Sequence, residues 1–492
     1  MLRKIKDHLF SNKDLRQTIL KNSFWIGLSI FVGRTIRAIV IIYAARILGT
    51  EGYGIFSYAM SVAAFFSIFS DIGLTSLVTR EIAKDPERKD DYVTTVFFLK
   101  IGILIVTLVA TIFLAPYFVK IEAVKPLIPL AAILVIFDNL RIFGFGFARA
   151  KEQMEKEGIL SIGTDILITI FSLYILFSSP SPFNLALMYV IGSLLGTIVT
   201  FLFLRKFLFH LSGRFNPKII KTILSVAIPF AVMGIFSALM INIDMVILGI
   251  FKNTNELGLY AAAQRPILLL YTLPAIIATS IFPIVSKLAH VDNGKAKMVL
   301  EKSISAILLV ALPIFVGGIV LSYPIIRFFF GTAYEDATLS FQILLSTILL
   351  VFPGGIIGNS LFSYNMEKKL MLASGLGATT NVLLDLILIP PLGINGSAIA
   401  TLTSQIVLNG ICFFGLKKQI PFGIKLKIPS VFLSLFFMTI SSYLLYSIGV
   451  HVILNIIISG IVYVIALVFT KEPLALEGKQ LVTTFKKNIP AS

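Results

Sequence analysis

Long apolar runs separated by short polar segments dominate this chain. A membrane-spanning helix needs about 20 mostly apolar residues, because the hydrocarbon layer is ~30 Å thick and each residue rises ~1.5 Å. The pattern therefore predicts an all-α polytopic membrane protein with about 14 transmembrane helices. We place them near residues 22–45, 55–78, 93–119, 126–148, 158–177, 182–204, 222–251, 257–286, 303–330, 337–364, 370–389, 394–416, 429–448 and 452–469.

Basic residues in the intervening loops predict the orientation. Alternate loops, beginning with the N-terminus, carry about 32 Lys and Arg together, whereas the opposite loops carry about 4. Cytoplasmic loops of membrane proteins are enriched in Lys and Arg, so both termini are expected in the cytoplasm. A wrong helix count in the middle would invert this alternation, and no inversion occurs.

Composition agrees with a membrane protein and narrows the function. The 492 residues are 57% hydrophobic and 14% charged, with a mean hydropathy of +0.94. The net charge of +17 lies in loops between apolar runs, which indicates membrane topology rather than nucleic-acid binding. One cysteine and four scattered histidines offer no disulfide framework and no metal-ligand spacing, so no cofactor is expected. The outer loops are a few residues long and no nucleotide-binding or zinc-protease motif occurs, so we expect no enzyme.

A weak internal repeat joins the two halves of the chain. Residues 48–59 and 248–263 both contain Leu-Gly, a short turn with glutamate, and a Gly-x-aromatic-x-x-Ala entry into the next helix. The two segments have the same predicted orientation. The repeat predicts two parallel six-helix lobes around a central site, as in carriers that alternate access between two halves.

Four stretches resemble the polysaccharide-transporter family of flippases, within the superfamily that also holds multidrug exporters and the peptidoglycan lipid flippase. They are Leu48–Phe56, Asp71–Ala83, Glu256–Ala263 and Asn381–Thr401. The resemblance implies a two-lobed carrier of 12 to 14 helices that moves a lipid-linked oligosaccharide across the membrane. With the repeat, it predicts lobes at residues 1–213 and 214–418, followed by a final helix pair and a cytoplasmic tail at 419–492.

Three arginines within helices are candidate binding residues for an anionic headgroup. Charges at membrane depth cost roughly 2.5–3.5 kcal/mol each on insertion scales, so they mark functional sites by default. Arg34 and Arg37 share a helix face at spacing i, i+3 and could each hold one phosphate of a lipid diphosphate. Arg265 could face them from the second lobe. The alternative is that these arginines form structural ion pairs. Arg34 and Arg37 would then pair with Asp71 or another acid, and Arg265 would pair with Asp244.

The intramembrane acids leave several interpretations open. Asp71 and Asp244 are candidates for ion pairs or for a proton or cation coupling site. Asp138 and Arg141, at i, i+3 and of opposite sign, favour a structural ion pair. Asp165 and Asp385 have no partner that the sequence suggests. Lys100 and Arg327 lie near predicted helix ends and are expected to extend toward the interface.

The leading hypothesis is a flippase in the plasma or inner membrane that carries an anionic lipid-linked glycan from the cytoplasmic to the outer leaflet. Its expected partners are this glycan, membrane lipids, a coupling cation (H⁺ or Na⁺) and glycan-assembly proteins, with no nucleic acid. A multidrug antiporter should carry an acidic cavity for its cationic substrates, and the three arginines argue against it. A membrane glycosyltransferase would need a larger outer domain. A non-transporting assembly factor for surface glycans remains as an alternative.

Overall fold

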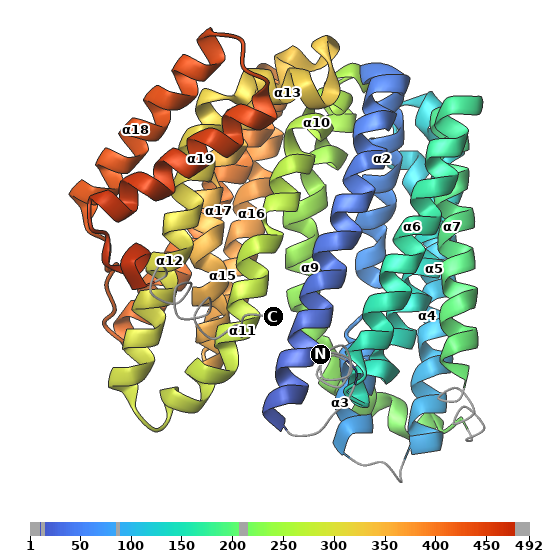
Figure 1. The fold of residues 1–492 in the computed structure, drawn as a ribbon. Helices are drawn as coiled ribbons and strands as arrows, with labels where there is room; N and C mark the ends of the chain where they lie inside the picture. Colours follow the sequence, from blue (N-terminus) through green and yellow to red (C-terminus); the bar gives the residue numbers. More distant parts are fainter. Residues whose placement is uncertain (1–9, 11–14, 85–88, 206–214, 478–492) are drawn as a thin grey trace, which may run out of the picture. The chain divides into compact units, whose positions relative to one another are not determined.

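The computed structural model describes residue 10 and residues 15–84, 89–205 and 215–477, in which every regular element is a helix (Figure 1). Within these residues, 12 helices are long and apolar enough to cross a membrane, or up to 13 if one bent helix pair counts as a span. The predicted all-α membrane class is confirmed. The total of fourteen crossings and the cytoplasmic termini remain predictions.

The first candidate span, Lys21–Phe69, has 49 residues and contains the first predicted helix and most of the second. It coincides with most of α2 (Leu15–Phe66), in which Gly49 has the non-helical torsions φ 68°, ψ −178°. A residue with positive φ is tolerated best when it is glycine, which has no Cβ to clash with the backbone. Gly49 therefore joins two helices, each with the length of one crossing.

The chain divides into two compact units. The first comprises Met1–Ala262 and Ala378–Ala400, and the second comprises Ala263–Gly377 and Thr401–Ser492. Three helices contribute to both, namely α10 (Thr254–Leu270), α16 (Glu367–Leu392) and α17 (Ile394–Gln419). The predicted lobes at 1–213 and 214–418 remain a prediction.

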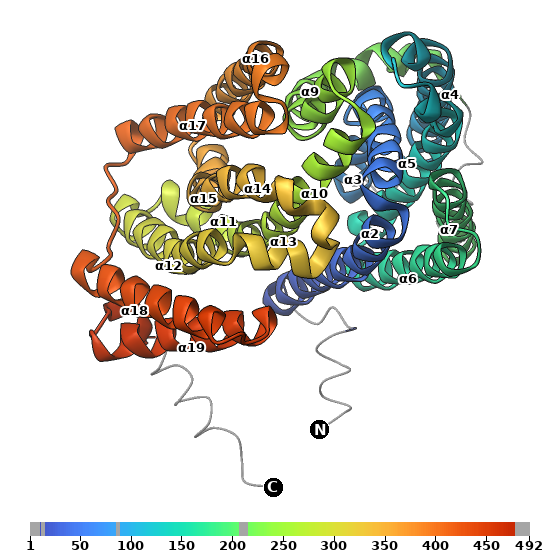
Figure 2. The same ribbon diagram turned by 90° about the horizontal axis from the view of Figure 1, so that it is seen from above.

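In the first unit, α2 packs along α6, α6 along α7, and α7 along α5, so that these helices lie side by side (Figures 1 and 2). The elements that lie wholly in this unit, besides α2, are η1 (Ser67–Phe69), α3 (Leu74–Lys84), α4 (Lys89–Phe118), η2 (Glu122–Leu127), α5 (Ile128–Ala150), α6 (Met154–Ser178), α7 (Pro182–Phe203), η4 (Pro217–Ile219) and α9 (Ile220–Phe251).

The two repeat segments contact each other reciprocally inside the first unit. A Cβ on Gly54 would overlap the carbonyl oxygen of Thr254, and a Cβ on Gly258 would overlap the carbonyl oxygen of Thr50. The Thr50 hydroxyl also donates to Asn255 Oδ1 at 2.8 Å. Because each glycine lacks a Cβ, the first turn of the other repeat's helix can approach it closely. The two segments therefore pack backbone against backbone.

The second predicted helix is interrupted in the structure. It continues from α2 through η1 to Phe69, breaks at residues 70–73, and resumes as α3. Gly73 has φ 84°, a torsion that favours glycine. Beyond the break, α3 contributes Leu74, Leu77 and Val78 to a buried cluster with the ends of α4, α5, α7 and α9. Both η1 and α3 contact α4 and α9, and α3 makes its most extensive contacts with α5.

The second unit contains the C-terminal helix pair. Asn455 of α19 donates to the Ser442 carbonyl of α18 at 2.9 Å, and Tyr463 donates to the Leu309 carbonyl of α12 at 3.1 Å. The elements wholly in this unit are α11 (Thr272–Ala289), α12 (Asn293–Val320), α13 (Ser322–Phe330), η5 (Thr332–Ala337), α14 (Thr338–Ser346), α15 (Ile348–Ser363), α18 (Ile428–Ser447) and α19 (Val452–Phe469).

The reciprocal glycine contact can be tested by substitution. Gly54→Ala and Gly258→Ala should each destabilise the protein by about 1–3 kcal/mol, because added methyl groups force backbone shifts in a packed interior. Gly102→Ala is the matched control, since a Cβ there meets nothing within 4 Å. Thermal unfolding of the purified protein in detergent measures the effect. Equal melting temperatures for all three variants would contradict the contact.

Candidate functional site

Arg34 and Arg37 lie one turn apart on α2, inside the first candidate span. Their surroundings differ. Arg37 is half-buried, and its Nε donates to Asp165 Oδ1 of α6 at 2.5 Å, whereas the Arg34 residue is exposed. The acid beside Arg37 is therefore Asp165 and not Asp71, which the sequence offered as a partner.

Gly33 makes this ion pair possible. A Cβ on Gly33 would overlap Asp165 Oδ2, so the carboxylate lies directly over the backbone of α2. Asp165 is 7% exposed and would be costly to bury without a counter-charge. Asp165 thus compensates Arg37, while Arg34 lies one turn away on the same helix.

Arg265 belongs to the second unit, as part of α10 after Ala262, and is half-buried. Its predicted position opposite the arginine pair remains a prediction.

Asp71 occupies the break between η1 and α3 and has a structural role there. Its Oδ1 accepts from the Thr75 backbone N–H at 3.4 Å and its Oδ2 accepts from the Thr75 hydroxyl at 2.5 Å. A carboxylate in this place satisfies a backbone donor at the start of α3 that has no partner within the helix. Lys100 Nζ lies 3.3 Å from the same Oδ2.

Lys100 is completely buried, so the prediction that it extends to the interface is wrong. Its ammonium group donates to the Ser70 carbonyl at 2.8 Å and to Asn139 Oδ1 of α5 at 3.3 Å, in addition to the ion pair with Asp71. An ammonium group has three donors, and three acceptors surround this one. Lys100 therefore donates a hydrogen bond to the Ser70 carbonyl, which has no helical partner at the break. Its bond to Asn139 connects the break to α5.

Asp244 of α9 lies in a wholly buried polar cluster. The Tyr260 hydroxyl donates to Asp244 Oδ2 at 2.5 Å. Asp385 of α16 lies within interaction range of Asp244, with Ser397 beside it, and all four residues are 0% exposed. Asn381, one helical turn before Asp385, is also buried, and neither of its amide atoms has a hydrogen-bond partner among the described residues. Two adjacent buried carboxylates cannot both remain charged unless a cation lies between them. Otherwise one of them binds a proton and becomes neutral.

The predicted ion pair of Asp138 and Arg141 is confirmed. Arg141 Nη2 lies 2.9 Å from Asp138 Oδ1, and the Ser193 hydroxyl of α7 donates to the same oxygen at 2.7 Å. This pair links α5 to α7. Arg327 lies in the last turn of α13 and is exposed, 3.6 Å from Glu335.

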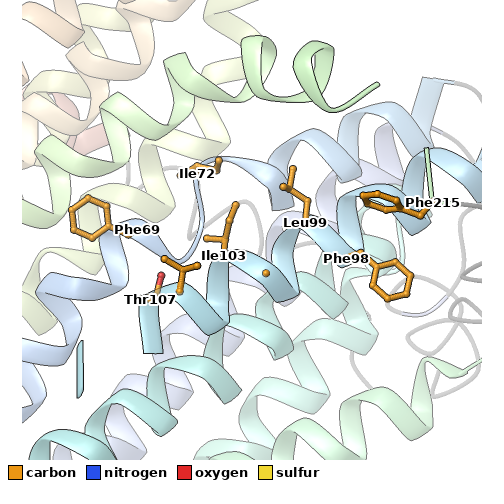
Figure 3. Close-up of a pocket in the computed structure, with 9 residues that line it drawn as sticks. Phe69, Ile72, Phe98, Leu99, Ile103, Thr107 and Phe215 are labelled. Atoms are coloured by element: carbon orange, nitrogen blue, oxygen red, sulfur yellow. The ribbon is translucent and has the colours of Figure 1, made fainter. Parts of the chain in front are cut away.

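An apolar groove of about 510 Å³ lies on α4 next to the helix break (Figure 3). Phe98 and Phe215 lie together at one end and Phe69 and Thr107 at the other. The groove is lined by Phe69, Ile72, Phe98, Leu99, Gly102, Ile103, Val106, Thr107 and Phe215. The only polar side chain among them is that of Thr107, so the groove suits a hydrocarbon chain better than a polar solute.

Sequence reasoning did not find the partners of Asp165, Lys100 and Asp385. No spacing in the sequence pairs Arg37 with Asp165, which are separated by 128 residues. Asp244 and Asp385 are also far apart in the sequence, and no motif joins them.

A family model described as "Polysaccharide biosynthesis protein" matches residues 19–289, which is more than half of the chain. The chain belongs to the polysaccharide biosynthesis protein family. A second model, "Lipid II flippase MurJ", matches residues 159–472. The predicted resemblance is thereby confirmed.

Individual relatives agree with this assignment. A putative O-antigen transporter of Shigella flexneri is 27% identical over 330 residues, covering 65% of this chain and 78% of the relative. The probable flippase AglR of Haloferax volcanii is 26% identical over 389 residues, covering 76% of this chain and 78% of the relative. A solved structure of the lipid II flippase MurJ, in an inward closed conformation, superposes with a TM-score of 0.74 at 19% identity. It covers 89% of this chain and 96% of that one, which shows a shared fold.

The Lys100 contacts predict a large effect on stability. Lys100→Met should cost about 3–5 kcal/mol, because it removes the donor of the buried Ser70 carbonyl and the counter-charge of the partly buried Asp71. The double variant Lys100→Met with Asp71→Asn should recover part of this loss, since no unpaired charge remains. Lys125→Met is the control, because the ion pair of Lys125 with Glu122 has exposed side chains and contributes at most about 1 kcal/mol. Thermal unfolding in detergent should rank the variants in this order, and a wild-type stability of Lys100→Met would refute the assignment.

Proposed function

We propose that this protein is a flippase, not an enzyme, that translocates a lipid-linked oligosaccharide repeat unit across the cell membrane by alternating access. The substrate carries a phosphate or diphosphate and moves from the cytoplasmic to the outer leaflet. The observation that carries the proposal is the arginine pair of the first candidate span, in which Arg37 is paired with the buried Asp165 and Arg34, one turn away, is exposed. Family membership and the names of the relatives support the same class of substrate.

The physical argument concerns the headgroup. Sugars and phosphates cannot enter hydrocarbon unaided, because each unsatisfied polar group costs several kcal/mol there. Arginine side chains replace phosphate hydration with paired N–H donors, while the lipid tail stays in the bilayer. A carrier of organic cations would be hindered by this positive charge. In this proposal Arg265 contributes from the second unit.

The arginine pair can be tested in reconstituted vesicles or by glycan export in cells. Arg34→Ala and Arg37→Ala should each lower transport by roughly tenfold or more, since a hydrogen bond to a charged group contributes about 1.5–3 kcal/mol. Arg34→Lys and Arg37→Lys should lower it less, because Lys keeps the charge but loses the planar pair of donors.

Arg327→Lys is the matched control, because this arginine is exposed at a helix end and should tolerate the change. Protein amounts in the membrane are measured in parallel. If transport falls only in proportion to folded protein, or if Arg34→Ala transports normally, the arginines have a structural role and the proposed headgroup site is wrong.

We also propose that Asp244 and Asp385 form the site for a coupling cation, H⁺ or Na⁺. Their burial and proximity support this role, because a proton or cation would relieve the repulsion between two carboxylates. Asp71 is a weaker candidate, since Lys100 already compensates its charge.

Asp385→Asn should make transport insensitive to imposed proton or sodium gradients in proteoliposomes, because the pair then carries one ionisable group less. Asp292→Asn is the control. The Lys295 backbone N–H donates to the Asp292 carboxylate at the start of α12, which lowers the pKa of Asp292, and asparagine can accept the same bond. A gradient response that survives in Asp385→Asn would exclude the coupling role.

A further inference from the structure

The groove on α4 is long enough for one leaflet of the membrane. Its lining runs along α4 from Phe98 to Thr107, a distance of about 14 Å for nine helical steps of ~1.5 Å. The hydrocarbon of one leaflet is half of ~30 Å. The groove therefore matches the depth of a lipid chain in a single leaflet.

The groove lies beside the helix break. Phe69 precedes the break and Ile72 lies within it, and both line the groove together with residues 98–107 of α4. Lys100 holds the break in place from the buried side. Phe69, Phe98 and Val106 remain more than half exposed, at 52%, 53% and 67%. Large exposed apolar side chains on a membrane span are suited to contact with lipid chains.

One end of the groove lies next to basic residues. Phe215, whose ring is 6.2 Å from that of Phe98, belongs to the connection between α7 and α9. The Asn216 backbone N–H donates to the Thr95 hydroxyl at 3.0 Å, which holds Asn216 against α4. Lys218 and Lys221 follow within six residues of Phe215 and are exposed. This connection lies on the predicted cytoplasmic side.

We propose that the groove is a binding site for an anionic phospholipid of the cytoplasmic leaflet. One acyl chain lies between Phe98, Gly102 and Val106, and the phosphate lies at Lys218 and Lys221. Basic residues at a membrane surface attract anionic lipids, and this attraction supplies the selectivity. The apolar lining binds the chain of any lipid, so the preference for negative charge depends on the two lysines. The site is separate from Arg34 and Arg37 and does not depend on the proposed transport activity.

The single tryptophan of the chain permits a direct test. In a Trp25→Phe background, Phe98→Trp places a reporter in the groove, and Phe113→Trp places a control on the same helix, where Phe113 is 66% exposed. The full-length protein is reconstituted into phosphatidylcholine vesicles with increasing fractions of brominated phosphatidylglycerol or brominated phosphatidylcholine. Quenching of tryptophan fluorescence gives the relative affinity of the two lipids at each reporter.

At low salt, phosphatidylglycerol should be preferred by about fivefold or more at the Phe98→Trp reporter, and by little at the Phe113→Trp reporter. Adding Lys218→Gln and Lys221→Gln should bring the preference near one, while quenching by brominated phosphatidylcholine stays unchanged and shows that the protein is inserted normally. Gly102→Leu should weaken quenching by both lipids, because a Cβ at this position extends into open space.

Two results would overturn the proposal. The first is an equal lipid preference at the two reporters, or a preference that persists without the lysines. The second is relief of quenching at the Phe98→Trp reporter by a few mole per cent of unbrominated polyprenyl phosphate but not by unbrominated phosphatidylglycerol. That result would assign the groove to an isoprenoid carrier lipid instead.

Discussion

A polar group that lies within hydrocarbon must find its partner inside the protein, and the structure of the first unit depends on this requirement. The break at residues 70–73 exposes backbone groups that a continuous helix would satisfy. Lys100 and Asp71 satisfy them from opposite sides of the break. Because their charges also compensate each other, the helix can be interrupted without leaving either charge unpaired.

The same requirement separates structural charges from those available for function. Asp138 is compensated by Arg141, and Asp71 by Lys100, so these pairs hold helices together. Around Asp165, the carboxylate pairs with Arg37, and Arg34 lies one turn away on the same helix. Asp244 and Asp385 bring two buried carboxylates together, and the Tyr260 hydroxyl donates to one of them. In the proposed function, the arginines bind an anionic headgroup and the two carboxylates bind a proton or cation.

The first unit also depends on close backbone packing at glycines. The start of each repeat helix packs against the glycine of the other repeat, Gly54 or Gly258. At Gly33, the Asp165 carboxylate that compensates Arg37 packs against the backbone. These glycines lie at positions where a methyl group would displace backbone or a charged side chain. The internal repeat thus has a physical meaning, because the two similar segments meet through equivalent atoms.

The sequence by itself determined the membrane class, most helix positions and the family, because these depend on local apolar runs and short motifs. The arginine pair as a headgroup site, which the cost of charge in hydrocarbon suggested, remains a proposal. The sequence did not determine which charged side chains on different helices lie next to each other. Arg37 with Asp165, Lys100 with Asp71, and Asp244 with Asp385 join separate helices, and helix periodicity places a residue on a face without showing which helix lies opposite. The break near Asp71 was hidden for the same reason: a continuous helix would satisfy its own backbone, and only tertiary structure brings Lys100 to the carbonyl of Ser70. The groove combines residues next to that break with residues of α4 and with Phe215, so it too was decided by the packing of helices and not by the pattern along the chain.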